Sequence, residues 1–303
     1  GDVLQHLGAA SLVRASTGFA IVSLFVLEAV ARHVDAKSMR ESYGVDAVAF
    51  ASEVPIEAGV AAELGLRLVG TLQNISYDQL YGGGFLNEMW GEFVLEVIEQ
   101  FLRQLPRIPY VISGQQLSPV FLPRILEHVA EFSPRLVGMR DQGSLGLLVD
   151  AGVSAAFSFD DAVESLLELG RRLKPCAGDG AFIHLNTSDY TGNDEALSEM
   201  VAHLRLVAAH VGSHERPVLL QAFQDAREVV VDSIETVKRL DLGFPFDDVE
   251  AVFLVTSILR AQSENAPARL LTGRFGYSSS YHVTLWLQLH GIPCWLRGRN
   301  SYY

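Results

Sequence analysis

Cysteine is scarce in this chain of 303 residues, which contains only Cys176 and Cys294. The two lie far apart and form no Cys-x-x-Cys pair, so neither a zinc knuckle nor a disulfide framework is indicated. His214-Glu215 is not followed by the second histidine of a zinc-protease helix. We therefore expect two reduced thiols, no metal site and a cytoplasmic protein.

Basic runs and long apolar runs are also missing. The chain has 23 Lys and Arg against 36 Asp and Glu, a net charge of −13, whereas nucleic-acid binders usually present a basic face. The longest apolar stretch, residues 18–31, is interrupted by Ser23 and Glu28 and is shorter than the roughly 20 residues of a membrane span. We expect a buried helix there, no transmembrane segment, no signal peptide and no nucleic-acid partner.

The usual phosphate-binding and hydrolase motifs are absent. Gly82-Gly83-Gly84 lacks the third glycine of the dinucleotide fingerprint, because position 87 is Asn87. Neither a GxxxxGK[ST] phosphate loop nor a GxSxG elbow occurs. The three glycines predict a tight transition from strand to loop, where the backbone either approaches a ligand or simply turns.

Short apolar runs alternate with segments of helical period along the chain, which favours βαβ units and a mostly parallel sheet. The predicted strands are residues 47–51, 66–72, 79–81, 110–113, 136–139 and 155–158, then 181–186, 217–222, 268–272 and 293–297. The predicted helices are residues 3–13, 20–33, 91–104, 119–132, 143–151 and 162–173, then 195–211, 233–240, 249–263 and 282–290.

Residues 170–179, GRRLKPCAGD, are charged and contain proline and glycine, which is typical of a linker. The alternation restarts after them. We therefore expect an α/β protein with two Rossmann-like lobes, residues 1–172 and 180–303, in a GT-B-like arrangement. Ligands would bind in a central cleft at the carboxyl ends of the strands.

Four segments resemble the polysaccharide pyruvyltransferase family, in the same order along the chain. They are Gly1-Asp2 at the start of a helix, the glycine-rich stretch 77–87, residues 136–162 with Arg140-Asp141 and Asp160-Asp161-Ala162, and a C-terminal segment around His282. Residues 114–119 are similar to the family's GQSIGP loop. The match near the C-terminus lies in spacing, since His282 precedes Gly291-Ile292-Pro293 by nine residues.

This resemblance implies a pyruvyltransferase that takes the pyruvyl group from phosphoenolpyruvate and forms a ketal on a sugar. The acceptor would be a glycan, a glycolipid or a lipid-linked oligosaccharide, and no cofactor beyond the co-substrate is implied. The C-terminal lobe would bind the donor and the N-terminal lobe the acceptor. Both a monomer and a homo-oligomer are compatible with the sequence.

The C-terminal segment departs from the family in one respect. The family's Arg-x-His triplet reads Ser280-Tyr281-His282, so its arginine is missing. We expect Arg274, six residues upstream, to lie in a loop that Gly276 bends back and to supply the missing cation. Arg297 and Arg299 are weaker candidates.

Phosphoenolpyruvate carries a phosphate and a carboxylate, and its methylene carbon must be protonated before a hydroxyl can add. His282, at the predicted start of a helix, suits the acid role, because helix N-termini bind phosphate. It is our candidate catalytic residue, with a capping or core histidine as the alternative. The remaining donor-binding candidates are Arg140, Arg274, Ser279, Ser280 and Tyr281.

Each of these side chains also has a structural interpretation. Arg140 could pair with Asp141 or Asp160, and the serines could cap the helix. The acceptor-binding candidates, for which capping and turn roles are alternatives, are Asp2, Gly83, Gly84, Asn87, Glu88 and Gln115, with Trp90 suited to a sugar face. No residue is identified as the general base.

Two other functions fit the same architecture. A nucleotide-sugar glycosyltransferase would need a carboxylate that binds ribose in the second lobe, and we find no clear candidate. The change from arginine to Ser280 instead favours a non-catalytic carbohydrate-binding relative.

Overall fold

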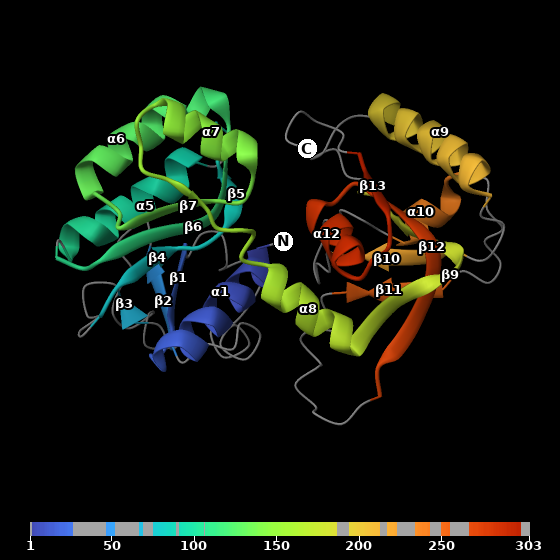
Figure 1. The fold of residues 1–303 in the computed structure, drawn as a ribbon, viewed down its shortest axis with the longest axis horizontal. Coiled ribbons are helices and arrows are strands. Elements are labelled where there is room, and N and C mark those ends of the chain that lie inside the picture. Colours follow the sequence, from blue (N-terminus) through green and yellow to red (C-terminus); the bar gives the residue numbers. More distant parts are fainter. Residues whose placement is uncertain are drawn as a thin grey trace. The chain divides into compact units, whose positions relative to one another are not determined.

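The computed structural model divides the chain into two compact units, residues 1–164 and 165–303 (Figure 1). It describes residues 2–26, 47–51, 67–68, 75–88, 91–105, 107–186, 194–212, 217–222, 234–242, 250–254 and 267–297. Among these residues, no helix is both long and apolar enough to cross a lipid bilayer. Each unit is an α/β structure, and every strand pairing in the described residues is parallel.

The first unit opens with helix α1 (Asp2–Thr17) and a sheet in the order β1-β2-β3. These strands are β1 (Val22–Val26), β2 (Ala47–Ala51) and β3 (Arg67–Leu68).

A second sheet of the first unit has the order β4-β6-β7-β8, and β5 also pairs with β6. Its strands are β4 (Asp78–Leu80), β5 (Gly83–Leu86), β6 (Tyr110–Leu117), β7 (Leu136–Met139) and β8 (Ala156–Phe157).

Three helices and a 3-10 turn follow the strands of this sheet. They are α5 (Gly91–Gln104), η2 (Pro119–Phe121) with α6 (Leu122–Phe132), and α7 (Gln142–Asp150). Their apolar faces pack on the sheet in one core that includes Leu95 of α5, Ile125 of α6 and Leu148 of α7, all fully buried. Because the strands of this sheet are parallel, their carboxyl ends lie at one edge of it.

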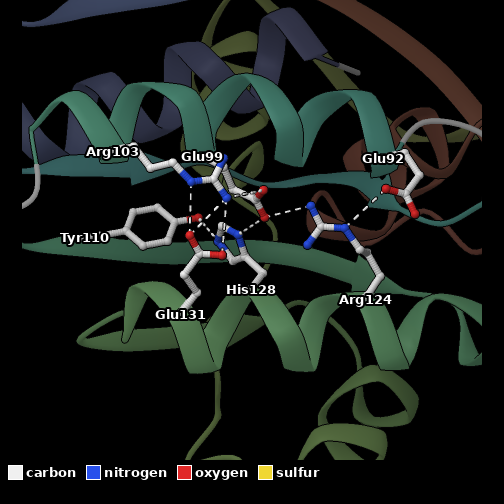
Figure 2. A network of polar contacts seen from close by, with 7 residues as sticks. All are labelled: Glu92, Glu99, Arg103, Tyr110, Arg124, His128 and Glu131. Atoms are coloured by element: carbon white, nitrogen blue, oxygen red, sulfur yellow. Dashed lines mark hydrogen bonds and ion pairs between the residues drawn. The ribbon is translucent and has the colours of Figure 1, made fainter.

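A polar network joins α5 to α6 above β6 (Figure 2). The Glu99 carboxylate accepts hydrogen bonds from Arg124 at 2.7 Å and from His128 Nδ1 at 2.9 Å. His128 Nε2 lies 3.1 Å from the Tyr110 hydroxyl. Burial lowers the pKa of His128, so its neutral ring donates through Nδ1 and accepts the Tyr110 hydroxyl proton at Nε2. Further ion pairs at the surface involve Glu92, Arg103 and Glu131.

The second unit contains helix α8 (Val163–Arg172), which begins at the unit boundary, and one parallel sheet in the order β11-β10-β9-β12-β13. The strands are β9 (Leu173–His184), β10 (Val218–Gln221), β11 (Glu250–Phe253), β12 (Arg269–Ser278) and β13 (Cys294–Leu296). Counted along the chain the order is 3-2-1-4-5, that of half of a doubly wound dinucleotide-binding fold.

Helices cover both faces of this sheet. Helix α9 (Asp194–Val211) and helix α10 (Ile234–Arg239) pack against Ile183 and Tyr277, while α12 (Tyr281–Leu289) lies on the opposite face over Gly276. A Cβ atom at Gly276 would stand 2.4 Å from Leu287 of α12, so glycine is required for this close packing.

Two predicted helices are wrong. Residues 20–33 contain strand β1, and residues 249–263 contain strand β11, although the rest of both segments lies largely outside the described residues. Strands buried on both faces form continuous apolar runs without alternation, and such runs resemble buried helices.

The predicted linker is also wrong in its local structure. Residues 170–172 end α8, and residues 173–179 belong to the long strand β9. Pro175 is tolerated because, among the described residues, this part of β9 pairs with β12 alone, at Leu271, while pairing to β10 begins at Phe182.

Two predicted loops are strands as well. Gly83 and Gly84 belong to β5, and β6 runs through Gln115 to Leu117. Gly114, with φ of +60°, lies where the pairing of β6 with β7 shifts register, so the strand bends there and continues.

Candidate functional site

The strand order of the second unit reverses between β9 and β12, and ligands of such sheets bind at the carboxyl ends of the two strands on either side of this point. His184 ends β9 and Ser278 ends β12, and these residues are paired in register. Both side chains are buried, and His184 Nδ1 lies 3.3 Å from the Ser278 hydroxyl oxygen. The topological switch point is therefore polar.

A turn of three serines leads from β12 into α12 at this point. The Ser278 hydroxyl accepts the backbone N–H of Ser280 at 2.9 Å, and the Ser279 hydroxyl accepts that of Asn186, beyond β9, at 2.6 Å. Ser280 is the N-cap of α12, but within the described residues its hydroxyl makes no capping hydrogen bond. The capping alternative therefore does not hold for the Ser280 side chain.

Tyr281 and His282 form the first turn of α12. Both are partly buried, and their rings meet edge to face with centroids 5.3 Å apart. The N–H groups of a first helical turn lack intrahelical acceptors, and the helix dipole adds partial positive charge there. Four of the predicted residues, Ser279 to His282, thus stand together at a helix N-terminus beside the switch point.

The prediction for Arg274 is wrong. It lies within strand β12 rather than in a loop, and its side chain is exposed. Strands rise about 3.3 Å per residue, so its Cα lies roughly 13 Å before Ser278, beyond the reach of an arginine side chain. Arg274 therefore cannot supply the cation that is missing at Ser280.

Arg297 is the arginine that stands near the serine turn. Its backbone N–H donates to the Ser278 carbonyl at 3.0 Å, because β13 pairs with β12 just before it. Its side chain is half exposed and lies 3.6 Å from Glu199 of α9. Arg299 lies outside the described residues.

Polar side chains also gather at the carboxyl edge of the second sheet of the first unit. At their centre is Asp161, whose Oδ2 accepts the backbone N–H of Gly82 and the hydroxyl of Ser113, each at 2.6 Å. A Cβ at Gly82 would stand 2.8 Å from the Gly114 carbonyl oxygen, and one at Gly114 would stand 3.0 Å from the Asp161 carboxyl carbon. Glycine at both positions lets the backbone close around this carboxylate.

Arg140 follows β7, as expected, and is paired with Asp160. The Nη1–Oδ2 distance is 2.8 Å, and both side chains are almost completely buried. Arg140 also donates to Gln116, while Asp160 accepts the N–H of Ala162 at 2.8 Å. The ion-pair alternative is thus present in the structure, and a donor-binding role for Arg140 stays a prediction.

The neighbouring Asp141 has a different role. It is the N-cap of α7 and accepts the Ser144 N–H at 2.8 Å, and Ser144 in turn accepts the Leu117 N–H at 2.9 Å. The Arg-Asp-x-x-Ser segment therefore joins the end of β6 to the start of α7.

Several acceptor candidates make local contacts. Asn87 is buried and donates to the Gly84 carbonyl at 2.5 Å, which is turn chemistry, and Gly83 lies in β5. Glu88 is exposed and accepts the Ser118 hydroxyl at 2.7 Å, and hydrogen bonds from its own N–H and from Ser118 lower its pKa.

Gln115 differs from the other candidates. It is fully buried and donates to the Tyr81 carbonyl at 2.5 Å, but its Oε1 has no hydrogen-bond partner in the part of the chain that the structure describes. A buried acceptor without a donor is costly. The Asp2 side chain and Trp90 lie outside the described part.

Sequence reasoning did not select His184 or Asp161. His184 lies within the predicted strand 181–186, which was the available signal, but the switch point depends on the strand order. Asp161 was noted only within the Asp160-Asp161-Ala162 segment, and its hydrogen bonds to Gly82 and Ser113 join residues 79 and 48 positions away. Among the described residues, no three His, Cys, Asp or Glu side chains gather in a way that could hold a metal ion.

No family model, curated protein or solved structure matches this chain. The likeness to the pyruvyltransferases is carried by the four sequence segments and by residues 114–119 alone.

Proposed function

We propose that this chain is a transferase that moves the pyruvyl group of phosphoenolpyruvate onto sugar hydroxyls as a ketal. The observation that carries the proposal is the Ser278–Ser279–Ser280 turn at the N-terminus of α12, beside the switch point, with His282 in the first helical turn. Backbone N–H groups and hydroxyls in this arrangement suit a phosphate or carboxylate. The sequence resemblance supplies the identity of the donor.

The proposed chemistry begins at the donor. His282 transfers a proton to the methylene carbon of phosphoenolpyruvate, and the adjacent carbon becomes cation-like. A sugar hydroxyl adds to that carbon, phosphate leaves, and a second hydroxyl closes the ketal. The helix N-terminus disfavours a charged imidazole, whereas bound phosphate favours it, so His282 would be protonated mainly when donor is present.

The first unit would bind the sugar acceptor. In support, Phe157 and Phe159 expose their rings at the carboxyl end of β8, with centroids 4.7 Å apart. Phe159 has φ of +62°, a conformation that is costly for a bulky residue and is often found at binding sites. Aromatic rings suit the apolar faces of sugars. The two-lobed, GT-B-like arrangement is part of the same proposal.

The test is phosphate release from phosphoenolpyruvate in the presence of a panel of sugars. Substitution His282→Ala should lower kcat by roughly 10²–10⁴, as for loss of a general acid, with little change in donor affinity measured by calorimetry. His210→Ala is the matched control, because His210 is exposed near the end of α9. Near-full turnover by the His282 variant would exclude the acid role, and a wild-type chain that neither binds nor consumes phosphoenolpyruvate would exclude the function.

One observation favours a second function, a nucleotide-sugar glycosyltransferase. The 3-2-1-4-5 strand order is that of a nucleotide-binding half, in which a carboxylate after the second strand commonly binds ribose. Here β10 ends at Gln221, which is followed by Ala222, and residues 223–233 lie outside the described part. Binding of uridine diphosphate, but not of phosphoenolpyruvate, would select this function.

A further inference from the structure

Phe159 has a backbone conformation that its own side chain does not explain. Its φ of +62° lies in the left-handed region, where a bulky residue is strained. Its side chain is 63% exposed, so burial of the ring contributes little to folding in return. Glycine or asparagine would make the same turn without this strain. The turn therefore needs the backbone conformation but not the aromatic ring.

The residues on either side hold Phe159 in this conformation. The Ser158 hydroxyl accepts the backbone N–H of Gly114 at 2.9 Å. On the other side, Asp160 is fixed by its ion pair with Arg140 at 2.8 Å. Strained conformations persist where the surrounding structure determines them in this way, and they cluster at ligand-binding positions. The first unit by itself therefore holds the Phe159 ring at its surface.

A second exposed ring lies beside that of Phe159. Phe157, at the end of β8, is 40% exposed, and the two rings pack edge to face with centroids 4.7 Å apart. Together they expose about the area of one aromatic side chain, roughly 150–250 Å². A specific protein interface covers about 800 Å² on each partner, so this patch suits a small ligand better than a protein.

The charges around the two rings indicate a neutral ligand. Residues 139–164 contain a single cation, Arg140, which is almost completely buried against Asp160, so no exposed cation of this segment could bind a phosphate. Gln142, at the start of α7, is exposed at the same edge, because β7 and β8 are paired and parallel. Its amide can both donate to and accept from hydroxyls. A pyranose ring, with C–H bonds on one face and hydroxyls around its rim, complements these groups.

We propose that Phe157 and Phe159 form the platform on which a pyranose ring of the sugar acceptor stacks. That the sugar is an acceptor rests on the function proposed above, whereas the stacking itself involves the first unit alone. The C–H face of the pyranose covers the exposed rings, and its hydroxyls stay at the rim, where water and the Gln142 amide bond to them. The fixed backbone at Phe159 holds the ring in place before the sugar binds, so less conformational entropy is lost on binding.

The test titrates the full chain with the methyl pyranosides of glucose, galactose and mannose, followed by saturation-transfer NMR without phosphoenolpyruvate. We expect at least one of them to bind wild type, with the strongest saturation at the C–H protons of one pyranose face. Phe159→Asn removes the ring and tolerates the left-handed backbone, so it should weaken this binding roughly 3- to 10-fold. Phe159→Tyr keeps an aromatic face and should retain the binding.

The matched control is Phe19→Asn, because Phe19 is 45% exposed in the same unit and its φ is negative. This variant should bind the pyranosides as wild type does. Urea unfolding separates a ligand-binding ring from a structural one. Phe159→Asn relieves backbone strain and should match or exceed the wild-type midpoint, whereas loss of a structural ring would lower it.

The outcomes separate this inference from the proposed function. Wild type that binds none of the pyranosides, or a Phe159→Asn variant that binds them equally well or has a lower urea midpoint, would overturn the platform. Wild type that dimerises while Phe159→Asn stays monomeric would overturn it in favour of self-association. Phosphate release from phosphoenolpyruvate by wild type would leave the transferase intact in each case. Wild type that binds pyranosides through Phe159 but does not consume phosphoenolpyruvate would overturn the transferase and leave a carbohydrate-binding surface.

Discussion

At the residue scale, the surroundings of each buried ionisable group determine what it contributes. Glu99 keeps its charge because Arg124 and His128 both bond to it, and its pKa is lowered despite burial (Figure 2). Burial raises the pKa of Asp161, and the hydrogen bonds from Ser113 and Gly82 offset this only in part. Their surroundings thus favour the ionised carboxylate at Glu99 and disfavour it at Asp161.

His6 provides a prediction about pH. It is buried against Ser23, at 2.6 Å, and burial lowers its pKa from 6.5 to about 4. Between these two pH values the unfolded chain binds a proton that the folded chain does not. The contribution of neutral His6 to the unfolding free energy, about 3 kcal/mol, is therefore fully present above pH 6.5. It is lost as the pH falls towards 4.

Replacing His6 with Gln should flatten the fall of the urea midpoint between pH 6.5 and 4, and the exposed His210→Gln should not. Asp78 acts in the opposite direction, because burial raises its pKa to about 6 and its charge costs stability as pH rises from 3.8. Comparison of each variant with wild type at each pH cancels this contribution. Equal slopes in wild type and His6→Gln would show that His6 does not titrate as stated.

At the element scale, strand β12 and helix α12 position the candidate donor site. Gly276 lets α12 approach the sheet, and the serine turn two residues later orients the helix N-terminus towards the carboxyl ends of β9 and β12. Trp286 of the same helix is fully buried, with its ring centroid 6.5 Å from that of Phe182. The position of the serine turn therefore depends on the packing of α12 against the sheet at Gly276.

Gly276→Ala tests that contact. The added Cβ would stand 2.4 Å from Leu287 and 2.8 Å from Cys294, so we expect a loss of about 1–3 kcal/mol in unfolding free energy from overpacking. The control is Gly146→Ala within α7, where a Cβ would meet nothing within 4 Å and helix propensity should add about 0.5–1 kcal/mol.

Urea unfolding of both variants measures this, because the unfolding free energy should fall in Gly276→Ala and rise in Gly146→Ala. If Gly276→Ala is as stable as wild type, α12 can move away from the sheet at little cost, and the position of the serine turn is not rigid.

At the scale of the whole molecule, net charge is the dominant property. The chain carries −13 at pH 7, and this charge repels itself more strongly in the compact state than in the unfolded one. Raising monovalent salt from about 10 to about 150 mM shortens the Debye length from about 30 to about 8 Å. We therefore expect stability to rise with salt.

Urea unfolding at several sodium chloride concentrations measures this effect, because urea is uncharged and adds no screening. Potassium chloride should give the same result if screening, rather than binding of one cation, is the cause. A midpoint that is independent of salt would mean that the charges are already compensated locally, as Arg140 compensates Asp160.

Much of the fold follows from local sequence. The helix at residues 91–104 and the strands at 47–51 and 136–139 were predicted with the bounds that the structure has. Amphipathic period identifies a helix, and short β-branched runs between turn residues identify a strand. Both signals are local, so no tertiary information is needed.

The predictions failed where neighbouring strands decide the outcome. Residues 173–179 resemble a linker but form a strand because β12 pairs with them, and Arg274 belongs to that pairing rather than to a loop. Likewise, His184 meets Ser278, and Asp161 meets Gly82, only because parallel strands bring their carboxyl ends to one edge. The sequence by itself determined the α/β class, most helices and the serine turn before α12. Only the tertiary structure decided which polar side chains meet, because strand order and hydrogen bonds between residues as far as 155 positions apart depend on the folded chain as a whole.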